Sequence, residues 1–96
     1  MSGFNTEIKR LGGVFHIQTQ DLGPSARSVE SLIYKSGKLL SSRKSDYTPF
    51  LGSPQLPDKI HHLMESQHAA ILKDIAEGRF DQYLTPEEKE SLPEKG

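Results

Sequence analysis

The stretch Val29–Lys44, VESLIYKSGKLLSSRK, constrains the fold more than any other feature because it predicts a β-hairpin. Two runs of alternating residues with high β propensity flank Ser36-Gly37, and a two-residue loop ending in glycine supplies the positive φ angles of a primed turn. The turn fixes the register of the two strands. The expected pairs are Tyr34–Leu39, Ile33–Leu40 and Val29–Lys44. Both hairpin faces are then partly apolar, so neighbouring strands and a covering layer are expected.

Two further strands are predicted before the hairpin. Phe4–Leu11 alternates weakly, Gly12-Gly13 breaks the pattern, and Val14–Gln20 resumes it with aromatic and β-branched residues. The polar face of this second strand carries His16, Gln18 and Gln20. Because the connections are short, including the loop Asp21–Ser25, the four strands are predicted to form an antiparallel meander.

One long helix is predicted over Leu56–Glu77. Pro57 suits its first turn, and Gly78 can adopt the left-handed conformation that ends a helix. The residues that recur with helical spacing form one stripe, namely Ile60, Leu63, Met64, Gln67, Ile71 and Ile75. A helix of this length can span a four-stranded sheet, which makes it the expected covering layer.

The two remaining segments carry fewer signals. The loop Ser45–Gln55 contains Tyr47 and Phe50, and it either seals the core or presents an exposed aromatic element. Thr85 followed by Pro86 is typical of the start of a short helix. The predicted architecture is an α+β domain over residues 1–82, a four-stranded antiparallel meander packed against one long helix, with a short peripheral helix and flexible tail over 83–96.

Length and composition limit the function classes. The chain has 96 residues, a net charge of −1 and no cysteine, which indicates one small domain and excludes disulfides and thiolate chemistry. The first ten residues, MSGFNTEIKR, contain no apolar segment, and no run approaches a membrane span, so a cytoplasmic protein is expected. Residues 1–50 carry seven basic and four acidic side chains, against five and nine in residues 51–96. This asymmetry indicates either two halves that meet within one domain or a patch that faces a partner.

No motif for catalysis or cofactor binding stands out. His61, Glu65 and His68 share one helical face, but their spacing is not that of a zinc-binding HExxH helix, and a solvated face is the expected explanation. Gly12-Gly13 lacks the lysine and helix start of a phosphate-binding loop. We therefore expect a protein that is not an enzyme and holds no metal or cofactor.

The expected function is protein binding, as an adaptor or regulatory module, with a homodimer as one form of partner. One helix covers only one face of the sheet, so the other face needs a loop, a second copy or another protein. The candidate partner-binding residues are His16, Gln18, Tyr34, Lys38, Arg43, Tyr47 and Phe50. Nucleic-acid binding through the basic hairpin is the alternative, although the chain is slightly acidic and lacks an RNP1-like pattern.

Three segments together resemble a group of small bacterial proteins and domains that have no assigned activity. These segments are FHIQTQDLG, VESLIYKSGKLLSSRKSDY and HAAILKDIAEGRFD, within residues 13–81. The positions that carry the pattern are His16, Gln18, Thr19, Gly37 and Tyr47, whereas Gln20 stands where the pattern has an acidic residue. The resemblance implies a bacterial origin and a domain that is also found joined to signalling modules, which fits an adaptor role.

Overall fold

The computed structural model describes residues 3–90, so the flexible tail predicted at the end of residues 83–96 lies outside the described residues. In chain order, the strands are β1 (Gly3–Arg10), β2 (Gly13–Asp21), β3 (Ser28–Lys35) and β4 (Lys38–Asp46). The helices that follow are η1 (Thr48–Phe50), α1 (Leu56–Ala76), η2 (Asp81–Tyr83) and α2 (Pro86–Glu90), of which η1 and η2 are single 3₁₀ turns.

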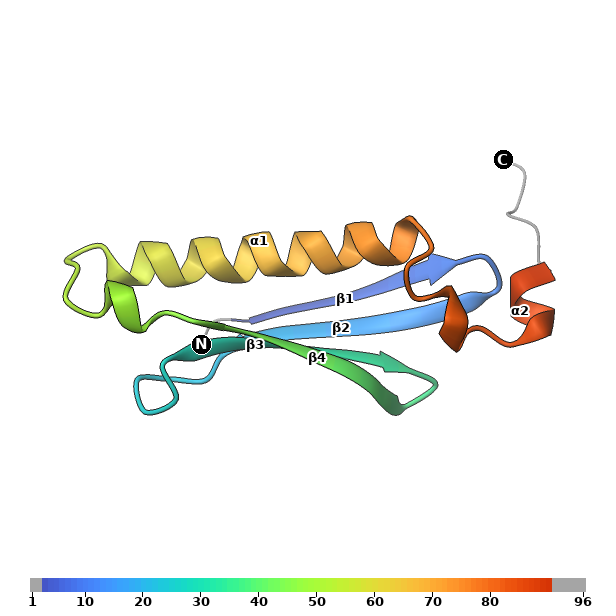
Figure 1. Cartoon of the computed structure of the whole chain (residues 1–96), viewed down its shortest axis with the longest axis horizontal. Helices are drawn as coiled ribbons and strands as arrows, with labels where there is room; N and C mark the ends of the chain where they lie inside the picture. Colours follow the sequence, from blue (N-terminus) through green and yellow to red (C-terminus); the bar gives the residue numbers. More distant parts are fainter. Residues whose placement is uncertain (1–2, 91–96) are drawn as a thin grey trace.

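The four strands form one antiparallel sheet in the order β1-β2-β3-β4, and α1 lies along one face of it (Figure 1). The helix packs against β1, β2 and β3. The predicted α+β meander with one long helix and a short C-terminal helix is therefore confirmed. We call the face under α1 the inner face and the opposite face the outer face.

The hairpin turn is confirmed, but the predicted register holds for only part of the hairpin. Ser36 and Gly37 have φ angles of 54° and 76°, and Tyr34 pairs with Leu39. Beyond that pair the register shifts by one residue, so that Ile33 lies opposite Ser41 and the predicted partner Leu40 is displaced. The extra residue is accommodated as a β-bulge, which the turn alone does not predict.

The bulge decides which side chains of β4 meet the helix. In the predicted register Lys44 would lie opposite Val29, whose side chain is fully buried. In the structure Ser45 takes that position, and Lys44 lies opposite Glu30 on the outer face. Burying an unpaired ammonium group is costly. The shifted register is therefore favoured, because it sets Ser45 rather than Lys44 opposite the buried Val29.

The turn between β1 and β2 also differs from the prediction. It consists of Leu11 and Gly12, whereas Gly13 pairs with Arg10 and belongs to β2. Gly13 is buried, and a Cβ atom placed on it would collide with the side chain of Leu84. A glycine at this position thus makes room for the segment that leads into α2.

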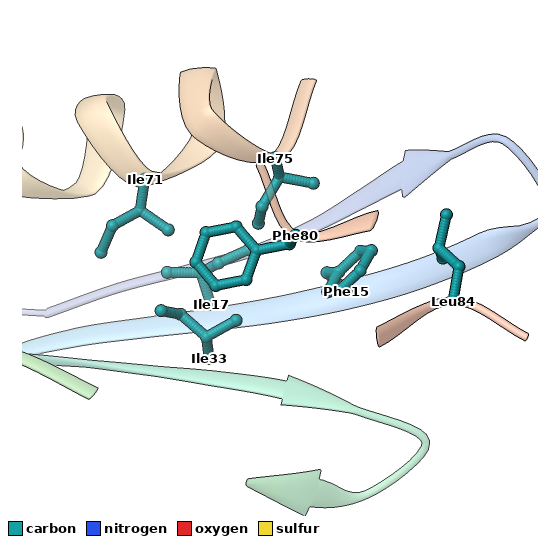
Figure 2. Packing of buried hydrophobic residues seen from close by; sticks show 7 residues of the cluster. All are labelled: Phe15, Ile17, Ile33, Ile71, Ile75, Phe80 and Leu84. Atoms are coloured by element: carbon teal, nitrogen blue, oxygen red, sulfur yellow. The ribbon is translucent and has the colours of Figure 1, made fainter. Parts of the chain in front are cut away.

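The larger apolar cluster lies between the last turns of α1 and the sheet. It contains Phe15, Ile17, Ile33, Ile71, Ile75, Phe80 and Leu84 (Figure 2). Gly78 has a φ of 89° and turns the chain back at the end of α1. Phe80 follows this turn, and the centres of the Phe80 and Phe15 rings are 6.2 Å apart. Phe80 therefore packs back against the end of α1, in the same cluster as Ile75.

A second apolar cluster lies under the first turns of α1. Its buried members are Val29, Tyr47 and Met64. The Tyr47 hydroxyl donates a hydrogen bond of 2.7 Å to Asp21 Oδ1, and burial together with this carboxylate raises the pKa of Tyr47 to about 12. Phe50 and Leu51 pack against the same cluster. The 45–55 loop was predicted either to seal the core or to present an exposed aromatic element. The structure supports the first alternative, a loop that seals the core.

A belt of hydrogen-bonded polar side chains separates the two clusters, and its centre is His68. His68 Nδ1 lies 2.7 Å from Thr19 Oγ1, and His68 Nε2 lies 2.8 Å from Thr6 Oγ1. Gln67 donates from Nε2 to Ser31 Oγ at 2.8 Å. His68 was predicted to lie on a solvated helix face, and this was wrong, because it is only 7% exposed. Gln67 does belong to the buried stripe, as a hydrogen-bonding member of it.

Candidate functional site

The candidate site is the outer face of the sheet, which no helix among residues 3–90 covers (Figure 1). Alternation along β2 buries Phe15, Ile17 and Thr19 on the inner face, and it turns the residues between them outward. Two rows of paired residues cross the middle of this face. They are Glu7–His16–Tyr34–Leu39 and Asn5–Gln18–Leu32–Ser42.

A shallow hollow lies over the middle of the outer face, with a volume of about 590 Å³. Its floor includes Val14, His16, Gln18 and Tyr34 from the two central strands. The β1–β2 turn and the hairpin turn border it at one end, and Glu88 of α2 lies at the same end. The hollow therefore combines strand side chains with a wall that comes from the last described helix.

The central part of the outer face carries no Lys, Arg, Asp or Glu. We call it the outer strip, and its members are Val14, His16, Gln18, Leu32, Tyr34 and Leu39. Val14 and Leu39 are the two large apolar side chains that the structure exposes most, at 39% and 52%. Charged residues surround the strip, namely Glu7, Lys9, Glu30 and Lys44. An uncharged centre inside a charged rim is the arrangement typical of protein interfaces.

Three of the seven predicted binding residues meet in this strip. His16 lies directly opposite Tyr34 on the neighbouring strand, and Gln18 follows on the same side of β2. All three also line the hollow. His16, Gln18 and Tyr34 are therefore the candidate binding residues that lie together on one surface.

The other four predicted residues lie elsewhere. Tyr47 is 1% exposed and supports the core, so its side chain is removed from any binding surface. Arg43 lies on the inner face and pairs with Asp74 of α1, with Nη2 and Oδ2 3.2 Å apart. Lys38 pairs with Lys35, next to the hairpin turn. Phe50 packs beside α1, with Lys59 Nζ 5.4 Å from its ring centre.

Glu88 is a residue of the site that the sequence analysis did not identify. Its carboxylate lies 2.9 Å from Lys35 Nζ, and its carbonyl oxygen accepts a hydrogen bond from the Gly12 amide. Hydrogen bonds from Lys35 and from the Thr85 amide hold the pKa of Glu88 below its ordinary value. The signal in the sequence was the capping pair Thr85 and Glu88, which marks the helix start but says nothing about where the helix docks.

The described residues offer no metal site and no membrane-spanning helix. Among residues 3–90, no three His, Cys, Asp or Glu side chains gather closely enough to hold an ion. His61 and Glu65 lie 3.8 Å apart on the exposed side of α1, but His68 is engaged with the two threonines of the belt. No helix in the described part of the chain is long and apolar enough to cross a membrane.

Comparisons with protein-family models, with curated proteins and with solved structures found no match for this chain. The functional argument therefore rests on the geometry of the outer face.

Proposed function

We propose that this chain is a small, non-enzymatic protein-interaction module, an adaptor or regulator in bacterial signalling, and that it binds its partner through the outer strip. The observation that carries the proposal is the uncharged centre of the outer face, where the half-buried Tyr34 and Leu32 lie beside the exposed Leu39. Aromatic and aliphatic side chains without neighbouring charges are the groups that contribute most when an interface is desolvated.

The two polar side chains of the strip fit the same function. His16 and Gln18 are exposed and are not engaged by the fold in any side-chain hydrogen bond that the described residues make. They are therefore available to donate to and accept from a partner, and such bonds would give specificity to an otherwise apolar contact.

Nucleic-acid binding has less support, because the basic residues of the hairpin do not form one surface. Arg43 is paired with Asp74, and Lys35 is paired with Glu88. Lys44 lies on the outer face opposite Glu30, which offsets its charge. A site for a phosphate backbone needs several cations that act together, and this distribution does not supply them.

Affinity capture with matched variants tests the proposal. The tagged chain is incubated with a bacterial lysate after nuclease treatment and a moderate-salt wash, in parallel with a Gln18→Ala, Tyr34→Ala double variant. The matched control is Lys73→Ala, since the Lys73 side chain is 74% exposed on α1, on the other side of the molecule. A stoichiometric protein that the wild type and the control retain, and that the double variant loses, supports the proposal.

Two results would contradict it. If the double variant captures the same protein as the wild type does, and the two unfold at the same temperature, the outer strip is not the binding surface. Recovery of nucleic acid that disappears steeply with rising salt would favour the alternative, because phosphate-dominated binding weakens by counterion release.

A further inference from the structure

We propose that the belt is a proton-sensitive clamp between α1 and the sheet, in which neutral His68 carries its hydrogen on Nε2 and a proton on Nδ1 breaks the chain of hydrogen bonds at Ser31. The inference concerns the inner face and does not depend on the proposed function. The members of the chain, in the order in which they contact one another, are Gln67, Ser31, Thr19, His68 and Thr6. The chain therefore links the helix to β1, β2 and β3.

The Gln67 amide sets the direction of the bonds at one end of the chain. Its Nε2 atom lies 3.1 Å from the carbonyl oxygen of Arg43, which can only accept, and its Oε1 atom accepts from the Ser45 hydroxyl. These two contacts fix which way the amide points, so Nε2 also donates to Ser31 Oγ. Ser31 thus accepts from Gln67 and has one hydrogen left to donate.

Two arrangements of the remaining hydrogens fit the distances. In the first, Ser31 donates to Thr19 and Thr19 donates to His68 Nδ1, which leaves the ring hydrogen on Nε2 to bond Thr6. In the second, these three bonds run the other way. The hydroxyl hydrogen that lacks an acceptor among residues 3–90 belongs to Thr6 in the first arrangement and to Ser31 in the second. Thr6 is half-buried, whereas Ser31 is fully buried, so the first arrangement costs less.

A second proton on His68 must bind at Nδ1, because Nε2 already carries one. Nδ1 then donates to Thr19, and Thr19 turns its own hydrogen to Ser31. The Ser31 hydrogen is left buried without an acceptor, which is the defect that disfavours the second arrangement. This defect is relieved when Gln67 gives up its bond and water reaches Ser31. Burial lowers the pKa of His68 from its ordinary value of 6.5, in agreement with a site that suits the neutral ring.

No carboxylate among residues 3–90 compensates the charge of a protonated His68. The charged side chains on the inner face of the sheet each have another partner: Arg10 pairs with Asp81, Asp21 with Tyr47, Lys35 with Glu88 and Arg43 with Asp74. On α1, Glu65 lies one turn before His68, but it is 60% exposed and lies 3.8 Å from His61. The β1 neighbour of the ring is Phe4, with 5.5 Å between the ring centres. Acid therefore opens the clamp.

NMR of the imidazole nitrogens tests the assigned tautomer. At about pH 8, where an ordinary imidazole is neutral, the wild type is expected to show the His68 hydrogen on Nε2. Gln67→Glu replaces the donor that sets the direction with an acceptor, so the chain should reverse and the hydrogen should move to Nδ1. Ala69→Glu is the matched control, because it adds the same charge beside His68 at an exposed position. It should leave the hydrogen on Nε2.

The response to acid is measured on the Gln67 side-chain amide. Its exchange with solvent, relative to a free glutamine amide at the same pH, should become roughly tenfold faster as His68 is protonated. A wild-type ring with its hydrogen on Nδ1 overturns the inference, whether or not the variant folds. A folded Gln67→Glu protein that keeps the hydrogen on Nε2 also overturns it, as does a Gln67 amide that stays protected while His68 titrates.

Discussion

The inner and outer faces of this sheet are built from the same strands, yet they differ in whether their polar side chains are hydrogen-bonded within the fold. On the inner face, Thr19 and Ser31 share a hydrogen bond of 2.6 Å, and each also bonds to a side chain of α1. On the outer face, His16 and Gln18 occupy equivalent positions along β2 and remain exposed. Polar groups within the protein core are thus satisfied internally, whereas His16 and Gln18 of the outer strip form no side-chain hydrogen bond within residues 3–90.

The belt also fixes how the helix sits on the sheet. Apolar contacts alone would tolerate a shift of α1 along the strands, because one isoleucine packs much like another. A shift would instead separate Gln67 from Ser31 and His68 from Thr19, which would leave buried polar atoms unpaired. We infer that the belt gives the helix one position along the inner face of the sheet.

The comparison is tested most strongly by one matched pair of truncations on β2. Ile17→Ala removes a fully buried side chain on the inner face of β2, under α1, and should lower the free energy of unfolding by about 2–5 kcal/mol. Val14→Ala, on the outer face, should change it by less than about 0.5 kcal/mol. Urea denaturation at low protein concentration measures both. Equal losses would mean that the outer face is part of the folding core.

A second pair compares the two glutamines. Gln67→Ala leaves Ser31, Ser45 and the Arg43 carbonyl without their common partner, and the expected loss of stability is about 1–3 kcal/mol. Gln18→Ala should stay within about 0.5 kcal/mol of the wild type. The same denaturation experiment reports both values. If Gln67→Ala lowers the stability no more than Gln18→Ala does, water must satisfy the polar groups that Gln67 bonds in the wild type.

The belt also predicts how stability depends on pH. Burial lowers the pKa of His68 from its ordinary value of 6.5, so the folded state favours the neutral imidazole. The unfolded chain then binds more protons below about pH 6.5, and stability should fall as the pH falls from there towards the lower folded pKa. Above pH 6.5 this contribution is fully retained.

Two variants isolate this contribution. His68→Gln keeps a hydrogen-bonding side chain that does not titrate, so the part of the pH dependence below pH 6.5 that belongs to His68 should disappear. His62→Gln, which makes the same substitution at an exposed position of α1, is the matched control. Thermal unfolding at several pH values measures the slope. An identical slope in all three proteins would assign the acid sensitivity to other groups.

The sequence predicted the elements of the fold because their signals are local. Ser36-Gly37 determines a turn by its own φ angles, and Gly78 ends α1 in the same way. The bulge at Leu40 could not be predicted, since its cause is long-range: it depends on whether Ser45 or Lys44 faces the buried Val29. Local alternation fits either register equally well.

The candidate site was predictable to a similar extent. The outward side of β2 follows from the period of two, so His16 and Gln18 were identified correctly as neighbours on one face. Whether the helix would cover that face or the other depends on packing, which alternation does not reveal. The roles of Gln67 and His68 were hidden for the same reason: a polar residue in an apolar stripe becomes structural only when the sheet supplies its partners.

The smallest expected effect concerns the end of the outer face, where α2 docks. Glu88→Gln weakens the ion pair with Lys35 but retains the backbone bond from the Gly12 amide to residue 88. The amide oxygen of the glutamine can still accept a hydrogen bond from the Lys35 ammonium, whose side chain is only 10% exposed, so global stability should change little. The effect should instead be local, and the Gly12 amide, which the docked helix protects, should exchange with solvent faster.

Hydrogen exchange followed by NMR measures this opening residue by residue, with Glu87→Gln as the matched control, since Glu87 is exposed on the same helix. Faster exchange confined to Gly12 and its neighbours would mean that α2 detaches from the sheet while the meander stays folded. The end of the outer strip would then be adjustable, because α2 forms one wall of the hollow and its detachment would widen the surface offered to a partner. Unchanged exchange would instead show that the backbone bond and the buried Leu84 hold α2 in place without the ion pair, and that the wall is as rigid as the sheet.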